Sequence, residues 1–234
     1  MKNSILILLL FFILGPLIDL DESYAQTEIF MGKAVNKNGE PEYTERHEVT
    51  YKEGKVIRSK TTYTDPSNRV IGDLVSEYMA DPRLCSYEFR DMRAKYEDGV
   101  RVEGDRLRLF RKQNPSDEVE SAYLPLMADQ IVGQGFHHFI LLNLEAIASG
   151  EVFHVKLVMP SRLKQYKFRI RKRELKEGIL SVRLEIDNWF LRLFAPHVDA
   201  EYDLKARHLL RYDGISNLSD ASGDFKKVII TYSY

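Results

Sequence analysis

Cysteine is almost absent from this sequence, and the short motifs of the common cofactor sites are missing. A single cysteine, Cys85, excludes an intramolecular disulfide. The chain holds no P-loop, no dinucleotide-binding glycine pattern, no C-x-x-C pair, no EF-hand loop and no G-x-S-x-G serine elbow. We therefore expect no cofactor and no enzymatic activity, and we interpret Cys85 as an inert buried thiol rather than a catalytic one.

Excess charge of either sign is lacking as well. The chain has 34 Lys and Arg against 35 Asp and Glu, which gives a net charge of −1. Residues 1–25 contain Lys2 against Asp19, Asp21 and Glu22, so the remaining residues carry a net charge of +1. General binding of nucleic acid rests on an excess of positive charge. The balanced charge therefore argues against a nucleic-acid partner.

The longest apolar run is too short to cross a membrane. It extends from Ile5 to Ile18, about 14 residues, whereas a membrane-spanning helix needs roughly 18–20. Lys2 precedes it, and the small residues Ser23 and Ala25 occupy the −3 and −1 positions if cleavage follows Ala25. This pattern predicts a cleaved secretory signal peptide over residues 1–25, with a membrane anchor as the alternative. We expect a periplasmic or secreted protein without a membrane span after cleavage.

Residues 26–234 are long enough for one domain with a real core, and most of them read as strands. In "DRLRLFRK", Leu107 and Leu109 alternate with polar residues, which is typical of a sheet with one solvated face. Turn dipeptides such as Asn38-Gly39 and Asp98-Gly99 separate such segments. The pattern predicts a meander of antiparallel strands within a single β-rich domain.

The stretch "GQGFHHFILLNLEAIASGE", residues 133–151, departs from this alternation. Its apolar residues cover nearly the whole helix circumference, which predicts a buried helix with its firm part over residues 136–148. Gly150 stands where a C-capping glycine is common. The predicted fold class is α+β, mostly antiparallel: a strongly curved sheet, or half-barrel, wrapped around one buried helix.

His137 and His138 are adjacent, so on a helix they point about 100° apart and cannot chelate one metal from the same face. Zinc-binding helices instead place two histidines four residues apart. We therefore expect no metal site. One histidine is predicted to pack in the core, and the other to cap or bond to a neighbouring strand.

The passages "FILLNLEAIASGE" and "VKLVMPSRL" and the closing "LLRYDGISNLSD" resemble uncharacterised bacterial periplasmic proteins. These are similar in architecture to the half-barrel group that includes DUF3108-like domains and lipoprotein carriers of the LolA/LolB type. The resemblance implies a carrier that holds acyl chains between sheet and helix. Because no cysteine precedes Cys85, this chain departs from the lipid-anchored receptors of that group.

Three functions follow as hypotheses. The first is an exported, non-enzymatic carrier of a lipid or another hydrophobic small molecule. The second is a structural or accessory envelope protein that binds a protein partner through strand edges or a basic face. The third, and least favoured, is an unrecognised hydrolase that uses His137 or His154 with nearby acids.

Each of the two main hypotheses has its own candidate residues. A carrier cavity would be lined by Phe136, Phe139, Leu142, Trp189 and Phe190. The partner or anion face would lie on the basic run of residues 162–173, "RLKQYKFRIRKR", whose solvated side carries Arg162, Lys167, Arg169 and Arg171.

Overall fold

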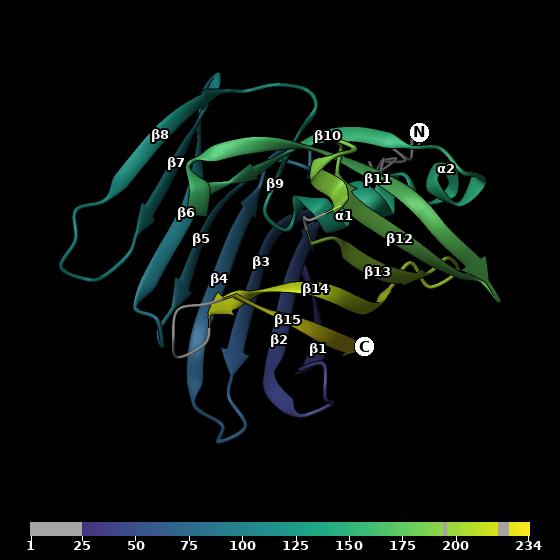
Figure 1. Ribbon diagram of the computed structural model, residues 1–234, viewed down its shortest axis with the longest axis horizontal. Coiled ribbons are helices and arrows are strands. Elements are labelled where there is room, and N and C mark those ends of the chain that lie inside the picture. The colour runs from purple at the N-terminus through teal and green to yellow at the C-terminus, as the bar shows by residue number, and fades with distance from the viewer. Residues whose placement is uncertain (1–24, 194–195, 220–224) are drawn as a thin grey trace, which may run out of the picture.

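The computed structural model describes residues 25–193, 196–219 and 225–234 (Figure 1). Apart from Ala25, the signal peptide predicted over residues 1–25 lies outside the described residues. Within the described ranges, no helix is both long enough and apolar enough to span a bilayer.

The first half of the chain forms an antiparallel meander of eight strands, each paired with its sequence neighbours. Along β2, alternate residues point to the interior, as the alternation in the sequence predicts. The strands are β1 (Gln26–Val35), β2 (Pro41–Lys52), β3 (Lys55–Thr64), β4 (Val70–Tyr78), β5 (Cys85–Asp91), β6 (Tyr96–Glu103), β7 (Arg106–Lys112) and β8 (Glu120–Pro125).

The second half continues the same sheet, because its last strand pairs with β1. In Figure 1 the second-half strands run across the steeply standing strands of the first half, so the sheet folds over on itself. Its strands are β9 (Gln130–Val132), β10 (Phe153–Met159), β11 (Lys164–Lys176), β12 (Ile179–Ile186), β13 (Val198–Asp203), β14 (Leu209–Ser219) and β15 (Phe225–Ser233).

The sheet is open, because β8 and β9 form its two edges and do not pair with each other. All neighbouring strands are antiparallel except β9 and β10, which are parallel. Parallel neighbours need a crossover connection of a dozen or more residues. The helical segment between residues 135 and 149 is that connection, which explains its position against the inner face. The mostly antiparallel, strongly curved sheet predicted from the sequence is therefore confirmed.

The single buried helix is not confirmed. Two short helices replace it, α1 (Gly135–Leu142) and α2 (Leu144–Ser149), with a break at Asn143. There the backbone leaves helical geometry, and the Asn143 side chain donates to the Phe139 carbonyl at 2.8 Å. Leu142 is 61% exposed, so the helical segment has a solvent face that its apolar sequence does not reveal. Gly150 adopts the left-handed C-cap conformation that the sequence predicts.

A close backbone approach sets the start of α1. A Cβ atom on Gly135 would lie 2.2 Å from the Arg83 carbonyl oxygen, so only glycine fits there. The same carbonyl accepts a hydrogen bond from the Val132 amide at 3.0 Å. The loop between β4 and β5 thus holds the end of β9 and the beginning of α1 together.

The interior contains two apolar clusters. The first lies mainly between the meander and the β14–β15 hairpin, and it includes Tyr63, Leu74, Phe89, Leu107, Leu109, Leu218 and Ile230. The second joins the helices to β9–β13, and it includes Ile140, Leu144, Ile147, Ile170, Leu180, Val182 and Tyr202. Buried polar side chains from β2, β3 and β4 lie outside both clusters.

Candidate functional site: an arginine-rich outer face and an exposed loop

The structure does not bring the five predicted cavity residues together. Phe139 is buried and packs edge-on against Phe153 at 5.3 Å, and Phe136 packs against the same apolar cluster. Leu142 faces solvent, and Trp189 and Phe190 are 72% and 54% exposed. The predicted apolar cavity between helix and sheet is thus not formed by these residues.

Trp189 and Phe190 belong to a loop on the opposite side of the sheet from the helices. The loop follows β12, where Leu184 points into the apolar cluster of the helices. Successive residues of a strand point to opposite faces, so Glu185 points outward. Arg192 of the loop reaches Glu185 at 3.4 Å, which places the loop over the outer face.

The outer face carries an arginine cluster built on two carboxylates. Arg169, Arg171 and Arg192 contact Glu185, and Arg173 and Arg183 contact Asp199, at distances between 2.5 and 3.4 Å. Register explains this grouping, because β12 aligns Glu185 with Arg169 of β11 and Arg183 with Asp199 of β13. Five arginines thus share two carboxylates, which leaves an excess of positive charge.

The same contacts keep Glu185 ionised. Burial by itself would raise the pKa of this carboxyl group, but hydrogen bonds from Arg171 and Arg169 outweigh it and lower the pKa to about 2. The pKa of Asp199 is also lowered: burial opposes this, and the Arg183 hydrogen bond prevails. Both carboxylates are therefore charged at neutral pH, and the net charge of the cluster stays positive.

The predicted basic face is present in part. Arg169 and Arg171 belong to the arginine cluster, and Lys167 is exposed two residues away on the same side of β11. Arg162 is elsewhere, in the 3-10 turn η1 (Pro160–Arg162), which packs on β6 and β7. Arg173 closes the basic run predicted from the sequence, whereas Arg183 and Arg192 were not predicted, because the alternation of one strand does not reveal partners on other segments.

The loop itself has a defined shape. The Asn188 side-chain oxygen accepts hydrogen bonds from the amides of Phe190 and Leu191 at 2.9 and 3.1 Å. The Asn188 carbonyl accepts from the Arg192 amide at 3.1 Å, where the short turn η2 (Leu191–Leu193) begins. Trp189 and Phe190 meet edge-on at 5.9 Å, and Leu191 is 50% exposed. We call Trp189, Phe190 and Leu191 the apolar tip.

A group of hydrogen-bonded polar side chains is buried on the inner face of the sheet. His47 Nε2 is 2.9 Å from Glu45 Oε2, and His47 Nδ1 is 3.0 Å from Thr61 Oγ1. Gln134 donates to Thr61 at 3.0 Å and accepts from Ser59 and Ser76. We call this set the interior polar chain: Glu45, His47, Ser59, Thr61, Ser76 and Gln134.

The order Glu45–His47–Thr61 matches the acid, base and hydroxyl of a hydrolase triad, but its surroundings differ. The Thr61 side chain is fully buried, and its oxygen already accepts the Gln134 hydrogen bond. A nucleophile must reach its substrate within about 3–3.5 Å. We therefore interpret Glu45, His47 and Thr61 as part of a hydrogen-bond network that joins the start of α1 to β2 and β3.

His137 and His138 lie on α1, shortly after Gln134 of the interior polar chain, and their predicted roles are confirmed. His137 Nδ1 lies 3.3 Å from the Tyr202 hydroxyl on β13, and His138 packs edge-on against Tyr78. Burial lowers the pKa of His137 to about 3, helped by the neighbouring histidines, and burial lowers that of His138 to about 4. No group of three or more potential metal ligands occurs among the described residues.

We expect stability to fall on acidification because of these histidines. A histidine in the unfolded chain has a pKa near 6.5. Between that pH and about pH 4, the unfolded chain therefore binds a proton at His138 that the folded chain does not bind. Each such group lowers the free energy of unfolding by up to about 1.4 kcal/mol per pH unit. Asp98 acts oppositely, because burial raises its pKa to about 6. Because two histidines destabilise the fold on acidification and one aspartate stabilises it, the free energy of unfolding should fall.

His138→Phe should reduce this loss, since phenylalanine keeps the ring contacts and removes the titration. Urea unfolding at pH 7 and pH 5 measures the difference between the two pH values for each variant. His154→Gln is the control, because the His154 side chain is 63% exposed and pairs only with Asp187 on the surface among the described residues. An unchanged pH difference in His138→Phe would contradict the assignment.

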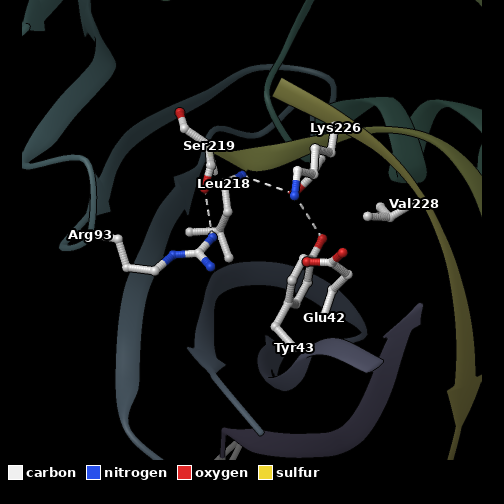
Figure 2. A pocket seen from close by; sticks show the side chains of 8 residues that line it. Glu42, Tyr43, Arg93, Leu218, Ser219, Lys226 and Val228 are labelled. Atoms are coloured by element: carbon white, nitrogen blue, oxygen red, sulfur yellow. Dashed lines mark hydrogen bonds between the residues drawn. The ribbon is translucent and has the colours of Figure 1, made fainter. Parts of the chain in front are cut away.

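A small hollow lies beside the end of β14 and has a volume of about 110 Å³. Figure 2 shows Arg93 and Lys226 on opposite sides of it, with Glu42 and Tyr43 of β2 below. Tyr43 meets the Ser216 hydroxyl at 3.0 Å, and Arg93 donates to the Ser219 carbonyl at 2.7 Å. Pockets for drug-sized ligands are usually roughly 300–1,000 Å³. This hollow suits water or a small ion better than an acyl chain.

Cys85 is fully buried, as predicted, and its thiol lies 3.3 Å from the Val132 carbonyl. Burial raises the pKa of this thiol to about 12. A thiol that stays protonated at neutral pH is a poor nucleophile.

Comparisons with known proteins were made by family model, by sequence and by structure. No family model matches the chain, and no curated protein sequence matches it. A solved structure, the beta-barrel-like protein of the domain of unknown function DUF1849 from Brucella abortus, aligns with 88% of this chain and 96% of its own, at 8% identity and a TM-score of 0.49. This likeness does not point to the DUF3108-like domains or to the LolA/LolB type, so that resemblance stays a prediction.

Proposed function

We propose that this chain is an exported, non-enzymatic binding protein of the bacterial cell envelope that acts through its outer face. The binding surface is the apolar tip together with the arginine cluster. Export is supported by the signal-peptide pattern of residues 1–25. The second of the three hypotheses from the sequence also names an envelope protein with a basic binding face, but it assigns that face a protein partner.

The observation that carries the proposal is the exposure of three consecutive apolar side chains beside an excess of positive charge. Trp189, Phe190 and Leu191 are each at least half exposed. Single exposed apolar residues are ordinary, whereas contiguous ones mark interaction sites. Arginine and tryptophan are also the residues most enriched among the energetically important positions of interfaces.

The carrier function receives less support. Ile140, Leu144 and Ile147 are fully buried against β11 and β12, so the chain's own side chains occupy the space between helix and sheet. Leu142, Trp189 and Phe190 lie outside that space. A lipid held there would first have to displace this core.

Binding to washed bacterial envelopes tests the proposal. The triple variant Trp189→Ser, Phe190→Ser and Leu191→Ser should lose most of its co-sedimentation with envelopes. Leu142→Ser is the matched control, because Leu142 is equally exposed but lies on the helical segment. Both proteins are first shown by urea unfolding to keep wild-type stability. Equal sedimentation of the triple variant, the control and the wild type would refute a role for this surface.

A further inference from the structure

We propose that the partner of this surface is an anionic lipid surface. The inference rests on the proposed function and specifies its partner. The apolar tip would enter the boundary between headgroups and acyl chains, while the arginine cluster and Lys167 would contact the lipid phosphates.

The side chains of the tip have the chemistry of membrane-interface anchors. Tryptophan is enriched at the membrane–water boundary because its ring combines a large apolar surface with one polar N–H group. Phenylalanine and leucine supply apolar area that enters roughly 5–10 Å into the bilayer in interfacial segments. Trp189 is the most exposed of the three, so the side chain best suited to the interface is also the most accessible one.

The loop holds this tip in place before any contact is made. The hydrogen bonds to Asn188 fix the turn, and Arg192, next to the tip, contacts Glu185 on the sheet. A preformed tip loses less conformational freedom on binding than a flexible one. The exposed apolar side chains therefore do not depend on a large rearrangement to reach a bilayer.

The charges lie where a bilayer would need them. Arg192 of the loop contacts Glu185 of the arginine cluster, so the exposed apolar tip lies beside the guanidinium groups. A guanidinium carries five donors and matches phosphate geometry. Arg173 is 45% exposed and, among the described residues, donates only to Asp199, which also holds Arg183. Donors thus remain for lipid phosphates.

This order favours a lipid surface over a protein partner. A bilayer presents phosphates next to apolar chains, which complements cations beside an exposed apolar tip. A protein partner would instead need a pocket for the Trp189 ring with acidic groups around its rim. That alternative is an outcome of the test below.

Trp189 supplies its own probe, because it is the only tryptophan in the sequence. The purified protein is mixed with vesicles of phosphatidylcholine alone and of phosphatidylcholine with phosphatidylglycerol. We expect a blue shift of the emission and quenching by brominated acyl chains only with the anionic vesicles. Raising the salt to about 0.5 M, where the Debye length is shorter than about 5 Å, should weaken binding.

Two variants separate the contributions of the tip and of the charges. Phe190→Ser with Leu191→Ser keeps the probe and should weaken vesicle binding roughly tenfold or more. Lys167→Gln with Arg173→Gln should weaken binding to anionic vesicles about tenfold. Lys33→Gln with Lys55→Gln, on exposed positions of β1 and β3, is the matched charge control. All proteins share the same N-terminus, so residues 1–25 cannot cause a difference between them.

The outcomes distinguish the two proposals. Unchanged emission with every vesicle, together with envelope binding that the triple variant loses, would overturn the lipid inference and indicate a protein partner. Unchanged emission and no loss of envelope binding would overturn both. Binding to neutral and anionic vesicles alike, unaffected by Lys167→Gln with Arg173→Gln, would overturn the role of the charges.

Discussion

Replacing Glu45 by leucine should lower the free energy of unfolding by roughly 3–5 kcal/mol at pH 7. The carboxylate is only 5% exposed and accepts hydrogen bonds from His47 at 2.9 Å and from Tyr232 at 3.2 Å. Leucine leaves the buried His47 ring and the partly buried Tyr232 hydroxyl without this acceptor, and an unsatisfied buried polar group costs its full desolvation penalty. Chemical denaturation measures the difference.

Two further variants test whether the cost comes from the lost partner. Glu48→Leu is the control, since Glu48 lies on the outer side of the same strand and pairs with Arg46 near the surface, where an ion pair contributes about 0–1 kcal/mol. The double variant Glu45→Leu with Tyr232→Phe should recover part of the loss, because it removes the hydroxyl that Glu45→Leu leaves without an acceptor. Equal costs for Glu45→Leu and Glu48→Leu would refute the interior polar chain.

The interior polar chain shows what the sequence contained but did not make obvious. In "EYTERHEVTY", Tyr43 and Val49 mark the inward face by their hydrophobicity, and Glu45 and His47 fall on the same alternating positions. Their position on the inward face is the sequence signal that indicates buried polar side chains. The participation of Gln134 could not be inferred, because it reaches Thr61 from the start of α1, 73 residues away along the chain.

The strands of the sheet can be predicted from the sequence, whereas the position of the loop that carries the apolar tip cannot. Alternation predicts the strands well, and Leu107 and Leu109 are fully buried as expected. Hydrophobicity alone does not tell which face of a sheet a loop covers, so it predicts an interior position for Trp189 and Phe190, which the structure places at the surface. The basic run was read correctly as a solvated face, but its compensating carboxylates come from other strands.

Two leucines of the helical segment give the sharpest test of the fold. Leu144→Ala should lower the free energy of unfolding by roughly 2–5 kcal/mol, because Leu144 is fully buried in the second apolar cluster and its removal leaves a cavity. Leu142→Ala should change it by no more than about 0.5 kcal/mol, because Leu142 is 61% exposed. Urea unfolding of both proteins measures the contrast.

The two substitutions make the same chemical change two residues apart, so each is the control for the other. Leucine and alanine both favour helix, and this preference changes little at either position. A helix buried on all sides, as the apolar sequence alone predicts, would make both substitutions costly. A large loss in Leu142→Ala would therefore contradict the exposed helical face and return this residue to the interior, where the carrier hypothesis placed it.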